Sequence, residues 1–112
     1  MKIKLLAVHL AATTAAFLCL ANTAFAQADA GKDALYVKSL AATCANCHGT
    51  NGKATEGSSV VSLAGLGKAY HIAQMAAFKN GTRPATIMHQ ISKGYSDAQI
   101  ETLATYFAAQ KK

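Results

Sequence analysis

Three patterns that define large classes of small proteins are missing from this sequence. No stretch alternates apolar and polar residues with a period of two, so no β-sheet is expected. The 11 Lys and Arg outnumber the five Asp and Glu, but they form no run of the kind that follows nucleic acid. No internal repeat or low-complexity tract is present. These absences argue against a sheet-based fold, a nucleic-acid-binding protein and a repeat array.

Cysteine is scarce, and its placement limits the possible chemistry. The chain has three cysteines, of which Cys19 lies in an apolar N-terminal run while Cys44 and Cys47 are three positions apart. Since there is no second cysteine pair, a four-cysteine zinc site is excluded. A disulfide between Cys44 and Cys47 would close a very small loop and would therefore stabilise the fold little.

The N-terminal segment has the features of a secretory signal peptide. Lys2 and Lys4 precede an uncharged stretch from Leu5 to Leu20, and small residues at 24 and 26 provide a cleavage site after Ala26. A retained membrane anchor is the alternative, but the apolar run is short for a spanning helix of about 20 residues. We therefore predict a signal peptide over residues 1–26, a single domain over 27–112, and no stable membrane insertion after processing.

Helical periodicity dominates the remainder of the chain. A helix is predicted over about 32–45, followed by a glycine-rich loop over 49–67. A second helix is expected over 68–81, with its buried face formed by Tyr70, Ala73, Ala77 and Phe78. Pro84 suits the first turn of a short helix over 84–92. The pattern predicts a small all-α protein rich in loops.

The last helix carries the clearest local signals. Ser96 and Gln99 form a capping-box pattern, in which a serine side chain and a glutamine three residues later satisfy each other's backbone donors. Apolar residues then recur at the spacing of one buried helical face, namely at Ile100, Leu103, Ala104 and Phe107.

The motif most informative for chemistry is Cys-Ala-Asn-Cys-His at residues 44–48. A thioredoxin-like dithiol would need neighbouring strands, which the pattern does not provide. A zinc site could draw on Cys44, Cys47 and His48 with His71 or His89, but adjacent Cys47 and His48 would strain a tetrahedron. Cys-x-x-Cys-His is instead the attachment signature of c-type haem.

Helix geometry explains this signature. Positions i and i+3 share one helix face, so two sulfurs can form thioethers with the two vinyl groups of one porphyrin. The histidine that follows can then ligate the iron, with its second ring nitrogen donating a hydrogen bond. One covalent haem c is therefore predicted, held by Cys44 and Cys47 with His48 as an axial ligand. Burying that porphyrin would add apolar surface to a small core, worth about 25 cal/mol per Å².

The second axial ligand has four candidates downstream, which are His71, Met75, Met88 and His89. Met75 lies inside an amphipathic helix, where methionine usually packs in the core. Met88 lies in the short segment before the last helix, where the chain can cover a haem face, and we favour it. His/Met ligation raises the reduction potential and suits electron transfer, whereas an open position would suit a haem enzyme or sensor.

Beyond these residues, the sequence resembles the class I c-type cytochromes over nearly all of residues 27–112. It is most similar to the group that includes the cytochrome subunit of flavocytochrome c sulfide dehydrogenase and cytochromes of the c4 type. The resemblance rests on residues 40–52, 62–66, 70–100 and 106–110, and above all on AFKNGTRPATIMHQISKGYSD at 77–97. Where such cytochromes often have a proline shortly before the leucine that corresponds to Leu63, this chain has Val60, Val61 and Ser62.

The resemblance implies a class I cytochrome c fold wrapped around one haem, with the first and last helices crossing. It implies His48 and Met88 as axial ligands and Leu63 packed on the haem. The function implied is that of a periplasmic single-haem electron carrier without catalytic residues of its own. Its partners would be redox proteins, with a sulfide-oxidising flavoprotein as one candidate and a freely diffusing shuttle role as the alternative. No nucleic-acid partner is implied.

Overall fold

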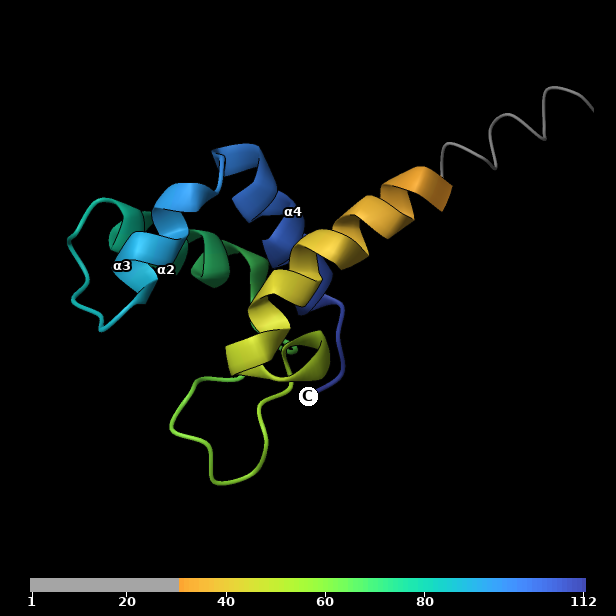
Figure 1. Ribbon diagram of the computed structural model, residues 1–112, viewed down its shortest axis with the longest axis horizontal. Helices are drawn as coiled ribbons and strands as arrows, with labels where there is room; N and C mark the ends of the chain where they lie inside the picture. The colour runs from red at the N-terminus through yellow and green to blue at the C-terminus, as the bar shows by residue number, and fades with distance from the viewer. Residues whose placement is uncertain (1–30) are drawn as a thin grey trace, which may run out of the picture. The chain divides into compact units, whose positions relative to one another are not determined.

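The computed structural model describes residues 31–112, and none of these residues belongs to a β-strand (Figure 1). The predicted signal peptide over residues 1–26 lies outside the described residues. Residues 36–112 form one compact unit, and residues 31–35, the described part of the other unit, are helical. No helix within residues 31–112 is both long and apolar enough to cross a membrane. The all-α prediction is confirmed.

The helices follow one another in a simple order. A helix covers residues 31–48 and is followed by the 3₁₀ turn η1 (Thr50–Gly52). The remaining elements are α2 (Lys68–Lys79), α3 (Met88–Ile91), the 3₁₀ turn η2 (Ser92–Gly94) and α4 (Asp97–Ala108). Helix α2 packs against both α3 and α4.

The helix over residues 31–48 extends beyond its predicted end at residue 45, so the cysteine-histidine motif lies on its last turns. Gly49 terminates it with a φ of 82° and donates its N–H to the carbonyl of Ala45 at 3.0 Å. A Cβ at this position would lie 2.0 Å from the carbonyl oxygen of Lys53. Only glycine fits here, because the backbone is left-handed and the next turn approaches closely.

The predicted buried face of α2 is correct only in part, because Ala77 and Phe78 are half-buried but the other two predicted residues are not. Tyr70 and Ala73 are exposed, whereas His71 and Met75, four residues apart, are buried and Phe78 is half-buried. The helix ends at Lys79, two residues before the predicted bound, and is followed by Asn80 and the left-handed Gly81. Alanine is small and occurs on both the buried and the exposed side of a helix, so it does not indicate which side is buried. A buried histidine such as His71 cannot be recognised by hydrophobicity, and the predicted face was therefore partly wrong.

The short helix predicted over 84–92 is also different in the structure. Residues 84–87 are irregular, and α3 begins only at Met88, after Ile87 with φ −137° and ψ −27°. Pro84 therefore does not start a helix. The chain before it is held instead by Thr82 and Arg83, which both donate to the carbonyl of Ala77 at the end of α2.

Helix α4 matches its prediction closely. Ser96 Oγ accepts from the N–H of Gln99 at 3.2 Å, and Gln99 Oε1 accepts from the N–H of Ser96 at 2.9 Å. All four residues of the predicted apolar face are buried. The capping box is thus formed, and the helix turns its apolar face inward.

The hydrophobic core is formed where the helix over residues 31–48 meets α4. Ala41, Leu103 and Phe107 make up its buried centre. Partly buried side chains surround this centre, namely Leu40, Cys44, Leu63, Tyr95 and Tyr106. The first and last helices are thus packed together, as the resemblance implied, and Cys44 and Leu63 lie at the margin of the core.

Candidate haem site

A cavity of about 400 Å³ opens beside this core. Its wall is drawn from the helix over residues 31–48, the loop that follows, α2 and the α3 region. The volume falls within the range of about 300–1,000 Å³ typical of ligand pockets. The wall includes all five residues predicted to hold the haem, which are Cys44, Cys47, His48, Leu63 and Met88.

Cys44 and Cys47 lie one turn apart near the end of their helix, and both line the cavity. Cys44 is half-buried and Cys47 is exposed, and no disulfide joins these two thiols. Burial raises the pKa of the Cys44 thiol, while the weak contact with Thr43 Oγ1 at 3.9 Å acts in the opposite direction. Two sulfurs on one helix face at a cavity wall fit the two vinyl groups of one porphyrin.

His48 is oriented by the backbone of the loop that faces it. Its Nδ1 lies 2.6 Å from the carbonyl oxygen of Val61. Because a carbonyl can only accept, the ring proton must lie on Nδ1, and a neutral imidazole then keeps the lone pair of Nε2 free. This is the arrangement expected for a histidine that ligates a metal through Nε2.

The loop that provides this carbonyl is anchored on Gly52. The carbonyl of Gly52 accepts from the N–H groups of Leu63 and Ala64 at 2.7 and 3.0 Å, and from Ser62 Oγ at 2.9 Å. Gly52 has a φ of 78°, and a Cβ there would lie 2.7 Å from the Phe107 ring. The loop is thereby fixed against the core, with Leu63 half-buried in the cavity wall.

Three of the four candidates for the second axial ligand lie in the cavity wall. Met88 is half-buried at the first residue of α3, and His71 and Met75 are buried on α2. The structure therefore brings Met88 into the same cavity as His48. His89, which follows Met88 in the sequence, does not line this cavity.

His71 has an unusual environment for a histidine. It is 4% exposed, its Nδ1 has no hydrogen-bond partner among the described residues, and its ring stacks on Phe107 with centroids 5.8 Å apart. Burial lowers the pKa of His71, and the nearby His48 lowers it further. The imidazole is accordingly neutral at pH 7 and forms part of the wall between cavity and core.

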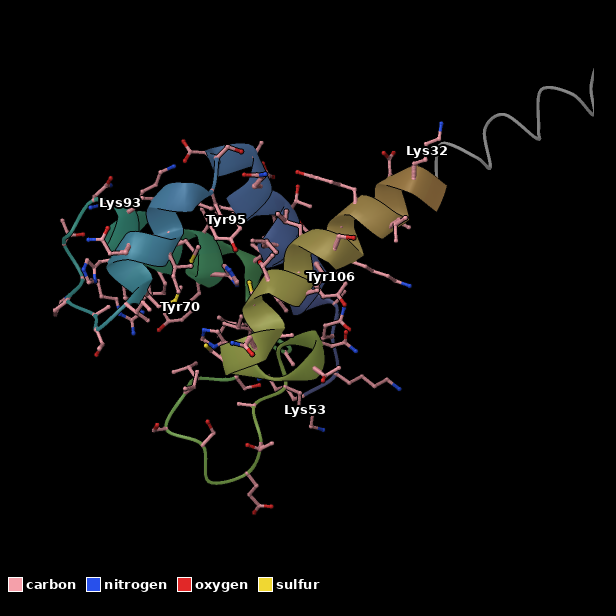
Figure 2. All side chains as sticks on the ribbon, in the orientation of Figure 1. Lys32, Lys53, Tyr70, Lys93, Tyr95 and Tyr106 are labelled. Carbon is pink, nitrogen blue, oxygen red and sulfur yellow. The ribbon has the colours of Figure 1, made fainter. Side chains whose placement is uncertain are left out.

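Tyr95 joins two parts of the cavity wall that are distant in the sequence (Figure 2). Thr43 Oγ1 lies 2.7 Å from the carbonyl of Leu40, to which it donates, and 2.6 Å from the Tyr95 hydroxyl. Tyr95 therefore donates to Thr43. This contact holds the helix over residues 31–48 to the segment between η2 and α4, on the side of the cavity where Cys44 lies.

The zinc interpretation of the motif finds no support in this geometry. Within residues 31–112, no three His, Cys, Asp or Glu side chains come together in a group that could hold a metal ion. His71 and His89 therefore do not complete a tetrahedral site with Cys44, Cys47 and His48. The residues fit a flat apolar cofactor with its own metal better than a bare ion.

Several residues of the site were not identified from the sequence. The carbonyl of Val61 could not be identified from the sequence as the acceptor for His48, because every residue has a backbone carbonyl. Gln74, Arg83 and Tyr95 also line the cavity. All three lie within residues 70–100, which carry part of the family resemblance, but the sequence assigned no role to any of them. Arg83 alone gave a usable signal, since it is the only arginine in the chain.

The chain is similar to known proteins over most of residues 31–112. The family model described as cytochrome c matches residues 34–111. A protein named cytochrome subunit of sulfide dehydrogenase, from Chlorobaculum tepidum, is 37% identical over 73 residues, covering 65% of this chain and 64% of that protein.

Two further relatives come from other bacteria. A thiosulfate dehydrogenase electron acceptor of Thiomonas intermedia is 37% identical over 71 residues, covering 63% of this chain and 33% of that protein. A cytochrome c4 of Pseudomonas aeruginosa is 36% identical over 84 residues, covering 75% and 41%. The matched region thus spans less than two thirds of the length of each of these relatives.

Proposed function

Because the chain belongs to the cytochrome c family, whose cofactor is covalently bound haem c and whose role is electron transfer, we propose how its own residues hold that haem. Cys44 and Cys47 form the two thioether links, His48 ligates the iron through Nε2, and Met88 ligates it from the opposite side. Leu63 packs against the porphyrin. A single Cys-x-x-Cys-His motif gives a single haem.

The observation that carries this proposal is the hydrogen bond from His48 Nδ1 to the carbonyl of Val61 at 2.6 Å. It fixes the tautomer and the orientation of the imidazole in a cavity that also contains both thiols and Met88. Haem supplies one-electron chemistry when bound, and the chain binds, orients and shields it. With a histidine and a methionine on the iron, the protein would act as an electron carrier of raised potential.

The attachment is tested by exporting the protein in a host that matures c-type cytochromes. We expect an intact mass equal to the chain after cleavage near Ala26 plus one haem, and a visible spectrum of a low-spin c-type haem. A colourless product with the mass of the trimmed chain alone would contradict the proposal. Fractionation of the host should recover the coloured protein from the periplasm, to which the proposed signal peptide would direct it.

The second axial ligand is tested with Met88→Ala and a matched control, Met75→Leu. Met88→Ala should lower the reduction potential and let carbon monoxide bind rapidly to the reduced protein, because the thioether no longer occupies the iron. Met75→Leu conserves volume in a buried residue and should leave both properties unchanged. If Met88→Ala keeps the native spectrum, the ligand is Met75, His71 or His89 instead.

For the partner, we propose a sulfide-oxidising flavoprotein that passes electrons to this haem. The name of the Chlorobaculum relative supports this pairing, since that protein is a subunit of sulfide dehydrogenase. Co-purification of a flavin-containing subunit from the native source, and reduction of the haem by that subunit on addition of sulfide, would support it. A haem protein that purifies alone would favour a diffusing shuttle, a role compatible with the name of the Thiomonas electron acceptor.

A further inference from the structure

Arg83 lies in the wall of the haem cavity, in the segment that joins α2 to α3. It is half-buried and lines the cavity, and its backbone N–H donates to the carbonyl of Ala77 at 3.1 Å. Its guanidinium Nη1 donates to Gln74 Oε1, and its Cζ lies 4.6 Å from the centroid of the Phe78 ring. Both of these α2 side chains also line the cavity, so the guanidinium is held at the wall.

The positive charge of Arg83 has no acidic counterpart in the cavity wall. Arg83 is the only Lys or Arg among the lining residues, and none of the lining residues is acidic. Within residues 31–112, Lys68 forms an ion pair with Glu101 and Lys79 with Asp97, and neither of these pairs involves Arg83. A half-buried guanidinium partnered by an amide and a ring keeps several donors for an anion, and leaving a desolvated charge unpaired is costly.

Haem c carries two carboxylate side chains, its propionates, and is otherwise flat and apolar. We propose that the Arg83 guanidinium binds a haem propionate and that Gln74 and Phe78 position it for this contact. The planar fork of an arginine matches a carboxylate through two parallel hydrogen bonds, which a lysine cannot provide. This inference rests on the proposed placement of haem c in this cavity.

Two electrostatic consequences follow for the chain. Arg83 keeps the bound propionate ionised by lowering its pKa, because a nearby opposite charge favours the charged form. It also compensates the negative charge beside the iron, which favours the reduced state. Without Arg83, the potential should fall, and propionate protonation should enter the neutral pH range. The potential should then decrease more steeply as the pH rises.

The test compares Arg83→Gln, Arg83→Lys and the control Lys93→Gln by potentiometric titration from pH 5 to 8. Lys93 is exposed on η2, on the outer side of the molecule (Figure 2), and its replacement removes the same charge. The other titratable side chains of the wall, His48, His71, Tyr70 and Tyr95, are unchanged in every variant. Intact mass and visible spectra first establish that each protein carries haem.

We expect Arg83→Gln to lower the potential and steepen its pH dependence, Arg83→Lys to give an intermediate profile, and Lys93→Gln to match the wild type. Infrared difference spectra between the redox states should show a protonated carboxyl band at acidic pH in Arg83→Gln only. If Arg83→Gln retains the wild-type pH profile and shows no such band, the propionate contact is wrong. If Arg83→Gln does not acquire haem, the test rests on Arg83→Lys. A wild-type pH dependence of the potential in Arg83→Lys would then equally contradict the propionate contact.

These outcomes are separate from those of the proposed attachment. A wild-type protein without haem would refute the attachment and the ligand set. A wild-type protein with haem, whose potential is insensitive to Arg83, would refute only the role of Arg83. If Arg83→Gln instead slows reduction by the partner without changing the potential profile, Arg83 is a docking residue and the inference fails.

Discussion

At the scale of single residues, His71 is the least satisfied polar side chain of the cavity wall. It is buried, its Nδ1 lacks a hydrogen-bond partner among the described residues, and burial lowers its pKa. A buried polar atom without a partner costs about 1–3 kcal/mol. Stacking on Phe107 offsets part of this cost, because paired rings contribute beyond simple burial.

His71→Leu should therefore stabilise the protein, by about 1 kcal/mol at pH 7.5, because the unpartnered nitrogen is removed. The substitution should also flatten the pH dependence of the free energy of unfolding. With the folded-state pKa of His71 below the unfolded value of about 6.5, the unfolded chain binds more protons below that pH. Stability in the wild type should then fall as the pH decreases from about 6.5 to 5.

Denaturant titrations at pH 7.5, 6.5 and 5 measure this effect. Tyr70→Phe, at an exposed neighbour on the same helix, is the control and should keep the wild-type slope. An identical loss of stability on acidification in His71→Leu and in the wild type would show that His71 contributes nothing to it.

The cavity residues of the Cys-x-x-Cys-His motif were predictable from the sequence, whereas the backbone acceptor of His48 and the wall side chains of Gln74, Arg83 and Tyr95 were not. The spacing of Cys44, Cys47 and His48 was enough to predict that they share one cavity. The acceptor for His48 belongs to a loop whose path is set by Gly52 and by contacts with Phe107. Such long-range packing leaves no periodic signal in the sequence.

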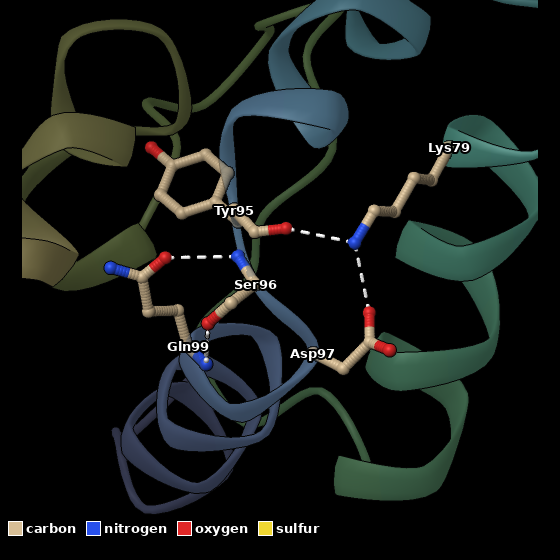
Figure 3. A network of polar contacts seen from close by, with 5 residues as sticks. All are labelled: Lys79, Tyr95, Ser96, Asp97 and Gln99. Carbon is tan, nitrogen blue, oxygen red and sulfur yellow. Dashed lines mark hydrogen bonds and ion pairs between the residues drawn. The ribbon is translucent and has the colours of Figure 1, made fainter.

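At the scale of secondary-structure elements, the N-terminus of α4 is the best-defined junction in the structure. Ser96 and Gln99 complete the capping box, and Lys79 at the end of α2 reaches the same turn (Figure 3). Lys79 Nζ donates to the carbonyl of Tyr95 and to Asp97 Oδ1, both at 2.9 Å. The contact couples α2 to α4 directly after Tyr95, which itself lines the cavity.

Ser96→Ala should lower the free energy of unfolding by about 1 kcal/mol, because the N–H of Gln99 loses its side-chain acceptor. Ser96→Asp should recover most of the loss, since aspartate is also a good N-cap. The matched control is Ser59→Ala, in the exposed loop before Val60, which should change stability little. Equal thermal and denaturant midpoints for Ser96→Ala and Ser59→Ala would argue against a contribution from the cap.

Two lysines of α2 allow a matched comparison of ion pairs. Lys79→Met should cost about 1 kcal/mol more than Lys68→Met, because Lys79 also donates to a backbone carbonyl. Among residues 31–112, Lys68 pairs with the exposed Glu101 alone, and exposed pairs contribute about 0–1 kcal/mol. Denaturant titration at low and high salt measures both. A larger loss for Lys68→Met than for Lys79→Met would show that the additional contact of Lys79 with the Tyr95 carbonyl does not add to stability.

Elements with strong end signals were predicted well, and elements defined by tertiary packing were not. The cap and apolar spacing of α4 placed all four of its buried residues correctly. The segment from Pro84 to Ile87 was predicted to be helical, but it has only a proline to indicate its conformation. Its path follows instead from the attachment of Thr82 and Arg83 to the end of α2.

At the scale of the whole molecule, the polypeptide encloses few large apolar side chains. Among the described residues, the buried apolar side chains are four large ones, Met75, Ile100, Leu103 and Phe107, and three alanines. Chains of this size often need a cofactor or covalent links in addition to their core. The cavity lies beside this core, so a bound porphyrin would extend the apolar interior directly.

Replacing both Cys44 and Cys47 by alanine should abolish covalent haem and leave the chain largely unfolded. The apolar cavity wall would face water, and the remaining core is too small to offset the entropy of ordering the chain. Circular dichroism and thermal melting of the exported variant measure this. A helical variant that melts cooperatively without haem would show that the helices are self-sufficient.

The hydrogen bond that orients His48 is accepted by the backbone carbonyl of Val61, which limits how this segment can change in evolution. Exchanging Val61 for another amino acid leaves the acceptor in place, so this hydrogen bond does not restrict the side chain at position 61. Adding or deleting a residue between Gly52 and Val61 would displace the oxygen itself. Selection should therefore preserve the length and the backbone path of this segment more strictly than the identities of its residues.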